Sequence, residues 1–205
     1  MATLTSPIKM LRALFLLALP LALAACGINS VPTAEENAKA KWADVQASYQ
    51  RRADLIPNLV AVASNSAQIE RETLEGVINA RASATQVQLS ADDLSDPARV
   101  EAFQTAQNNG SGALSRLLVT VERYPDLKSQ ERFADLMTQL EGTENRINIS
   151  IRDYNAAVQD YNTRIRTFPE MIGAKLIHGA KPLTPFEAKA GADVAPDVGA
   201  MFNGN

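Results

Sequence analysis

The chain has 205 residues, a formal net charge of −3, one cysteine and one histidine. Phosphate contacts need clustered lysine and arginine, so this acidic balance argues against nucleic-acid binding. A single cysteine excludes a disulfide bond within the chain. Helix-forming residues dominate, glycine and aromatic residues are sparse, and β-branched runs are absent, which predicts an all-α fold.

The first 25 residues have the layout of a secretory signal peptide. Lys9 and Arg12 precede an apolar run from Leu14 to Leu23, and small residues lead to Cys26, as in a bacterial lipoprotein signal. Cleavage before Cys26 would make it the lipidated first residue and, by removing two basic residues, would take the formal charge from −3 to −5. The alternative is a transmembrane anchor, but the run is shorter than the roughly 20 residues of a bilayer span and Pro20 interrupts it.

Acyl chains on Cys26, palmitate among them, are expected to hold the protein at a membrane of the cell envelope without an amphipathic helix. Gly27 follows the cysteine, at a position where aspartate would often signal retention in the inner membrane. In a Gram-negative cell we therefore expect the periplasmic side of the outer membrane.

Residues 26–32 are expected to form a tether, followed by a helical bundle over residues 33–168. Thr33 and Glu36 have the spacing of a capping box, which predicts a first helix from about residue 34 to Ile56. Pro57 either kinks this helix or opens another, because proline lacks the N–H donor and clashes with the preceding turn. We favour a second helix over residues 58–88.

Farther along, residues 90–96 read as a loop, and Asp96-Pro97 predicts the start of a third helix that runs to about Glu122. A turn at residues 124–126 precedes a fourth helix from about Lys128 to Thr167, which Pro169 stops. Residues 169–186 mix apolar residues with glycine and proline and are expected to be irregular. Residues 187–205 lack periodicity, which predicts a disordered tail.

Apolar side chains recur along the first, third and fourth helices in alternating steps of three and four residues. This heptad pattern is typical of long helices that cross at about +20°, as in coiled coils and bundles. It predicts an elongated antiparallel bundle of about four long helices. On the fourth helix the seam consists of Phe133, Met137, Leu140, Glu144, Ile147, Ile151, Tyr154, Val158, Tyr161, Ile165 and Phe168.

Two charges interrupt these seams, Arg52 on the first helix and Glu144 on the fourth. A local shift of register would let both side chains reach solvent. The sharper hypothesis is that they pair inside the bundle, because a buried carboxylate needs a partner and arginine provides a bidentate one. Such a pair would fix the register of the helices.

Several ungapped motifs resemble the signature segments of the LemA family: residues 51–60 (RRADLIPNLV), 124–128 (YPDLK), 140–147 (LEGTENRI) and 152–163, which begin RDYN and end YNT. The resemblance covers about residues 36–170. It implies a bundle of long helices held at a membrane by the N-terminus, with no established enzymatic activity. Polar residues within these motifs either cap and cross-link helices, which we favour, or form a surface for a ligand or partner: Asp54, Asn58, Asn145, Asn155 and Asn162.

No pattern in the sequence predicts catalytic residues, a metal site or a cofactor. His178 is the only histidine and is expected on the surface. The leading hypothesis is a lipid-anchored scaffold or adaptor for unidentified envelope proteins. The alternative is a membrane-active or lipid-handling module that sets Met171-Ile172 and Leu176-Ile177 against the bilayer.

Overall fold

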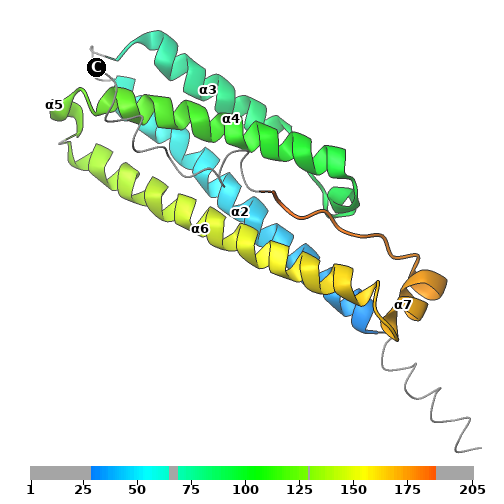
Figure 1. The fold of residues 1–205 in the computed structure, drawn as a ribbon. Coiled ribbons are helices and arrows are strands. Elements are labelled where there is room, and N and C mark those ends of the chain that lie inside the picture. The colour runs from blue at the N-terminus through cyan, green and yellow to red at the C-terminus, as the bar shows by residue number, and fades with distance from the viewer. Residues whose placement is uncertain (1–28, 65–68, 129, 188–205) are drawn as a thin grey trace, which may run out of the picture.

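The computed structural model describes residues 29–64, 69–128 and 130–187, and these residues form an all-α bundle (Figure 1). The predicted fold class, an elongated antiparallel bundle of four long helices, is confirmed. The long helices are α2 (Ser30–Ser64), α3 (Arg71–Gln86), α4 (Pro97–Val121) and α6 (Glu131–Arg164). Short helical segments are η1 (Ala91–Ser95), α5 (Pro125–Lys128), α7 (Glu170–Gly173) and η2 (Ala174–His178).

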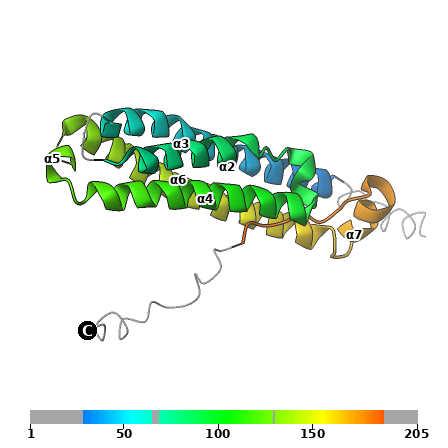
Figure 2. The same ribbon diagram turned by 90° about the horizontal axis from the view of Figure 1, so that it is seen from above.

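The bundle is built from two main helix pairs. The α2 helix packs along α6, α3 packs along α4, and α2 also contacts α3. Figures 1 and 2 show α5 at one end of the elongated molecule and α7 at the other. The first turn of α2 lies at the α7 end, so the chain enters the bundle there.

The first helix begins earlier than predicted. Ser30 already belongs to α2, and the Thr33 hydroxyl donates to the Asn29 carbonyl over 2.8 Å instead of capping the helix. Glu36 pairs with Lys39 at 3.1 Å. The capping-box prediction at Thr33 is therefore wrong, because the polar residues that suggested a helix start make contacts within the first turns.

The prediction that a second helix spans residues 58–88 is also wrong. The α2 helix continues through Pro57 to Ser64, and the next helix starts at Arg71. Proline at position 57 leaves the carbonyl of Ala53, four residues earlier, without its helical donor. The Arg81 guanidinium, on α3, fills this gap, because its Nε donates to that carbonyl over 2.6 Å. A contact from another helix thus stabilises proline inside α2.

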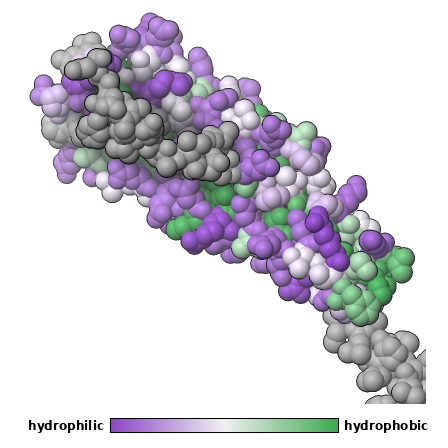
Figure 3. All heavy atoms as spheres, in the orientation of Figure 1, coloured by the Kyte–Doolittle hydropathy of each residue, from purple (hydrophilic) through white to green (hydrophobic). Residues whose placement is uncertain are grey.

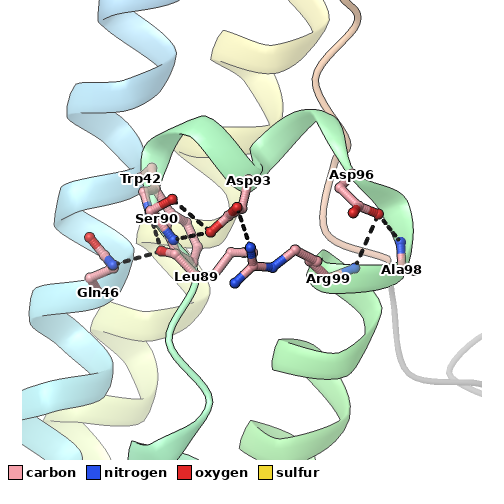
Figure 4. A network of polar contacts seen from close by, with 8 residues as sticks. All are labelled: Trp42, Gln46, Leu89, Ser90, Asp93, Asp96, Ala98 and Arg99. Atoms are coloured by element: carbon pink, nitrogen blue, oxygen red, sulfur yellow. Dashed lines mark hydrogen bonds and ion pairs between the residues drawn. The ribbon is translucent and has the colours of Figure 1, made fainter.

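The connection between α3 and α4 is fixed to α2 (Figure 4). The Leu89 carbonyl accepts hydrogen bonds from Trp42 Nε1 at 3.1 Å and from Gln46 Nε2 at 3.0 Å. Trp42 is buried, so its indole N–H needs such an acceptor.

The same connection contains a polar network that starts α4. Asp93 Oδ2 accepts from the Ser90 hydroxyl at 2.6 Å and from the Ser90 amide at 3.0 Å, and these bonds, with Arg99 nearby, lower the pKa of Asp93. Asp96 caps α4 by accepting from the Ala98 amide at 3.0 Å. The predicted helix start at Asp96-Pro97 is confirmed.

The described residues after position 124 contain more helix than expected. Pro125 and Asp126, predicted as part of a turn, belong to the short helix α5 (Pro125–Lys128). The predicted fourth helix is α6, which begins at Glu131 and ends at Arg164. The segment predicted to be irregular contains α7 and η2, and then runs without helix over residues 179–187. We call residues 179–187 the C-terminal strap. The signal peptide, Cys26, residues 27–28 of the tether and residues 188–205 lie outside the described residues.

Buried apolar residues form two clusters along the bundle. The cluster at the α7 end is centred on the aromatic residues Trp42, Phe103, Tyr154 and Phe186, whose rings contact one another. The cluster toward α5 is built mainly from aliphatic side chains such as Leu59. Polar side chains separate the two clusters along α2.

We expect Arg81→Met to lower the free energy of unfolding by about 1.5–3 kcal/mol, the range for a hydrogen bond from a charged group. Pro57→Ala restores the helical donor to the Ala53 carbonyl, so the loss should shrink in that background. Urea melts of the single and double variants measure this coupling. Arg71→Met is the matched control, because its side chain is 90 % exposed. Equal losses at position 81 in both backgrounds would contradict the assignment.

Candidate functional site

Arg52 is the centre of a polar hub that we define as Arg52, Tyr49, Gln107, Ser111 and Glu144. Its Nη1 donates to Glu144 Oε1 on α6 at 2.9 Å and to the Ser111 hydroxyl on α4. Its Nη2 donates to the Gln107 side-chain oxygen at 3.0 Å and to the Gln107 backbone carbonyl at 3.3 Å. One guanidinium thus links three long helices.

Two further contacts complete the polar hub. Gln107 Nε2 donates to the Ala84 carbonyl at 3.1 Å, which brings α3 into the network. The Arg52 guanidinium lies 5.0 Å from the centroid of the Tyr49 ring, within cation–π range. Burial raises the pKa of Tyr49 to about 12, although the nearby Arg52 opposes this rise. The phenol therefore stays neutral at physiological pH.

The two partners of the Arg52–Glu144 ion pair differ in burial. The Arg52 side chain is 5 % exposed, whereas that of Glu144 is 41 % exposed. The structure thus brings together the two charges that interrupt the heptad seams, but it buries only the arginine. Solvent can hydrate the carboxylate, which reduces the cost of removing its partner.

The other polar residues of the LemA-like motifs fall into two groups. Asp54, Asn58 and Asn145 are exposed, and Asp54 accepts from Gln50 Nε2 at 2.8 Å on the same helix. Asn155 and Asn162 both bind the C-terminal strap. The expected cross-link between helices is thus, for these two residues, a link between a helix and an extended segment.

Asn155 and Asn162 make the same pair of bonds, one heptad apart on α6. Asn162 Oδ1 accepts from the Leu183 amide at 2.9 Å and its Nδ2 donates to the Leu183 carbonyl at 2.8 Å. Asn155 binds the amide and carbonyl of Phe186 at 2.8 and 2.9 Å. Each asparagine therefore holds both backbone groups of one strap residue.

Tyrosines beside the two asparagines add a second repeat. Tyr154 donates its hydroxyl to the Thr184 carbonyl at 2.9 Å, and Tyr161 donates to the Lys181 carbonyl at 3.0 Å. Burial raises the pKa of both tyrosines, so both remain donors. We call Tyr154, Asn155, Tyr161 and Asn162 the α6 ladder. The sequence carries a signal for this ladder, a Tyr-Asn pair repeated after seven residues, but the repeat alone indicates only core and structural positions.

Exposed apolar side chains gather at the α7 end of the molecule (Figure 3). We define the apolar tip as Phe168, Ile172, Leu176 and Ile177, whose exposed fractions are 75, 48, 81 and 59 %. The small residues Gly173 and Ala174 face the bundle instead. The segment thus buries its small residues and exposes its large ones, which is unusual for a water-facing surface and typical of an interaction site.

Within the described ranges, no helix is long and apolar enough to cross a membrane. The same part of the chain contains no group of three or more histidine, cysteine or acidic residues placed to hold a metal ion. His178 lies exposed at the end of η2.

The asymmetric burial of the Arg52–Glu144 pair predicts unequal costs of mutation. Glu144→Gln keeps an acceptor for Arg52, and we expect it to cost about 1–2 kcal/mol of unfolding free energy, between the limits for exposed and buried pairs. Arg52→Met leaves buried Gln107 and half-buried Ser111 without their donor and should cost about 3 kcal/mol. The double variant should lose less than the sum in urea melts. Additive losses, each under about 1 kcal/mol, would contradict the polar hub.

The chain is similar to proteins that are named for the magnetosome. It is 28 % identical over 181 residues to the magnetosome proteins MamQ 2 and MamQ 1 of Paramagnetospirillum magneticum, and 27 % identical to MamQ of Magnetospirillum gryphiswaldense. These alignments cover 80 % of this chain and 66 % of each relative, so the chain spans just under two thirds of their length. The model of the LemA family matches residues 41–199, and the chain belongs to that family.

Proposed function

We propose that this LemA family protein is a lipid-anchored scaffold or adaptor of the cell envelope with no catalysis of its own. In this proposal the α7 end of the bundle contacts the membrane. The apolar tip carries the proposal. Phe168, Ile172 and Leu176 follow one another at intervals of four residues, and Ile177 extends the same patch. Such a patch gains free energy when a bilayer interface removes it from water, by about 25 cal/mol per Å².

The position of the apolar tip fits an anchor at Cys26. The α2 helix starts at Ser30 at the same end as α7 (Figure 1). Cys26 and Ser30 are four residues apart, and four residues of chain span at most about 14 Å. Acyl chains on Cys26 would therefore keep the α7 end of the bundle close to the membrane surface. One lipid anchor and one apolar contact together would orient the long axis of the bundle.

Charge around the apolar tip supports the same orientation. Residues 160–181 contain four basic and two acidic residues, whereas the whole chain has a formal charge of −3. Basic residues near a bilayer are attracted to anionic lipid headgroups. The acidic remainder of the bundle would then face away from an anionic membrane.

A role as scaffold or adaptor is supported by what the motif residues do. Arg52 holds the long helices together, and Asn155 and Asn162 hold the C-terminal strap, so these polar groups serve the architecture. The MamQ relatives are named for the magnetosome and not for a reaction. We propose that the partners are envelope proteins. The alternative, a membrane-active or lipid-handling module, would use the same apolar tip.

We expect Cys26→Ser to abolish acylation and leave the protein unprocessed or wrongly located. The reason is that lipid attachment needs the thiol at the end of the signal sequence. Metabolic labelling with a palmitate analogue, followed by fractionation of the envelope, measures both effects. Equal label on wild type and variant would contradict the lipid anchor.

We expect Leu176→Trp, in the full chain reconstituted into vesicles of brominated phosphatidylcholine and phosphatidylglycerol, to show quenched fluorescence, because the apolar tip lies among the lipid chains. Val119→Trp is the matched control, since Val119 is 70 % exposed but lies near the C-terminal end of α4, toward α5. Trp42 is 1 % exposed and supplies a constant background. Equal quenching of the two variants would overturn the orientation, and dye release from the vesicles would favour the membrane-active alternative.

A further inference from the structure

The C-terminal strap is held mainly by side chains. Gly179 and Ala180 donate their amides to the Ala174 carbonyl of the adjoining η2. Beyond these, the described residues show one backbone–backbone hydrogen bond from the strap to another segment, from the Thr184 amide to the Leu94 carbonyl at 2.8 Å. Six bonds come instead from the α6 ladder. All six bonds reach backbone groups of the strap. They therefore recognise the extended backbone and do not depend on the side chains of the strap.

The spacing of the α6 ladder matches the repeat of an extended chain. Asn155 and Asn162 are seven residues apart on a helix, which corresponds to about 10.5 Å. Their partners Phe186 and Leu183 are three residues apart, which corresponds to about 9–10 Å in extended or polyproline II conformation. The two periods agree, and the strap runs antiparallel to α6.

Prolines occupy strap positions whose backbone amides are not needed as hydrogen-bond donors to the α6 ladder. Pro182 and Pro185 each precede a residue held by an asparagine. Proline lacks an N–H, and it favours an extended conformation in the residue before it. The prolines therefore prepare the strap for the α6 ladder without removing any of the amide donors that bind it.

Two side chains of the strap supply selectivity. Leu183 and Phe186 are 7 % and 6 % exposed, whereas their proline neighbours are exposed. The Phe186 ring stacks on Trp42 with centroids 5.7 Å apart and meets Tyr154 edge-on at 5.6 Å. The groove thus accepts an apolar residue and, three positions later, an aromatic residue.

The heptad spacing of Asn155 and Asn162 also places a third asparagine on α6. Asn148 lies one heptad before Asn155 and is exposed. At the other end, Gly179 closes η2 with φ of 55°, a left-handed conformation that glycine adopts without strain. The strap therefore starts at a glycine turn, from which it can be released without unwinding a long helix.

We propose that the groove over the α6 ladder is a binding site for an extended segment of a partner protein, and that the C-terminal strap is its built-in competitor. The partner segment has the pattern proline–apolar–x–proline–aromatic and binds antiparallel to α6. Because the strap is attached, it acts at a millimolar effective concentration and keeps the site closed to weak ligands. This inference does not depend on the orientation at the membrane.

The test uses the strap sequence itself, residues 179–187, as a synthetic peptide. In the full chain carrying Leu183→Ala and Phe186→Ala, loss of the ring stacked on Trp42 should shift tryptophan emission to longer wavelength. Added peptide should reverse the shift, because its own phenylalanine fills the site. Trp42 is the only tryptophan of the chain, so the signal reports this groove directly.

Three controls separate backbone recognition from simple apolar contact. Adding Asn155→Ala or Asn162→Ala should weaken peptide binding about tenfold, because two hydrogen bonds are lost each time. A peptide methylated on the leucine nitrogen lacks the donor to Asn162 and should lose a similar factor. A peptide with alanine in place of phenylalanine should not reverse the shift.

Wild-type protein provides an arm that does not depend on the strap variant. A fluorescein-labelled strap peptide should bind it measurably but more weakly, since the attached strap competes, and circular dichroism should report unchanged helix. Absence of binding to both wild type and variant would overturn the proposal, as would binding insensitive to the asparagines. If wild type elutes as a dimer that the peptide converts to monomer, the occupant is the strap of a second copy.

Discussion

The architecture depends on burying one guanidinium at the middle of a four-helix bundle. Arg52 lies between two apolar clusters, and its donors must all find acceptors because an unpaired buried charge is costly. Acceptors on α4 and α6 meet this demand, and Gln107 extends the network to α3. These bonds have direction, whereas apolar contacts do not, so we propose that the polar hub selects one register among several that the heptad seams would allow.

Sequence periodicity predicted the helices because heptad spacing and the helix start at Asp96-Pro97 are local signals. Pro57 wrongly suggested a helix boundary, because the carbonyl that it leaves without a helical donor is bonded by Arg81, which lies on another helix. The Arg52–Glu144 contact could be proposed because two opposite charges interrupt two apolar seams. Their unequal burial could not, since exposure depends on how α4 and α6 approach α2.

The C-terminal strap shows a different limit of sequence reasoning. Residues 179–187 have no helical or strand period, so their order comes entirely from partners elsewhere in the chain. The repeated Tyr-Asn pairs at positions 154 and 161 carry half of that information, and the prolines at 182 and 185 carry the other half. Taken alone, the Tyr-Asn pairs are compatible with ordinary core positions of a helix, and the prolines are compatible with an ordinary loop. Only the contact between the two segments in the structure shows that the Tyr-Asn pairs bind the strap.

The asparagines of α6 repeat every seven residues, and the strap residues that they bind repeat every three. The two spacings match only when the asparagines lie on the same face of the helix. Inserting one residue between Asn155 and Asn162 would turn the second amide about 100° around α6 and destroy the match. Inserting seven would restore it and add room for three more residues of ligand. Family members that differ in length within this stretch of α6 are therefore expected to differ by whole heptads, and the length of the segment they hold should change in steps of three.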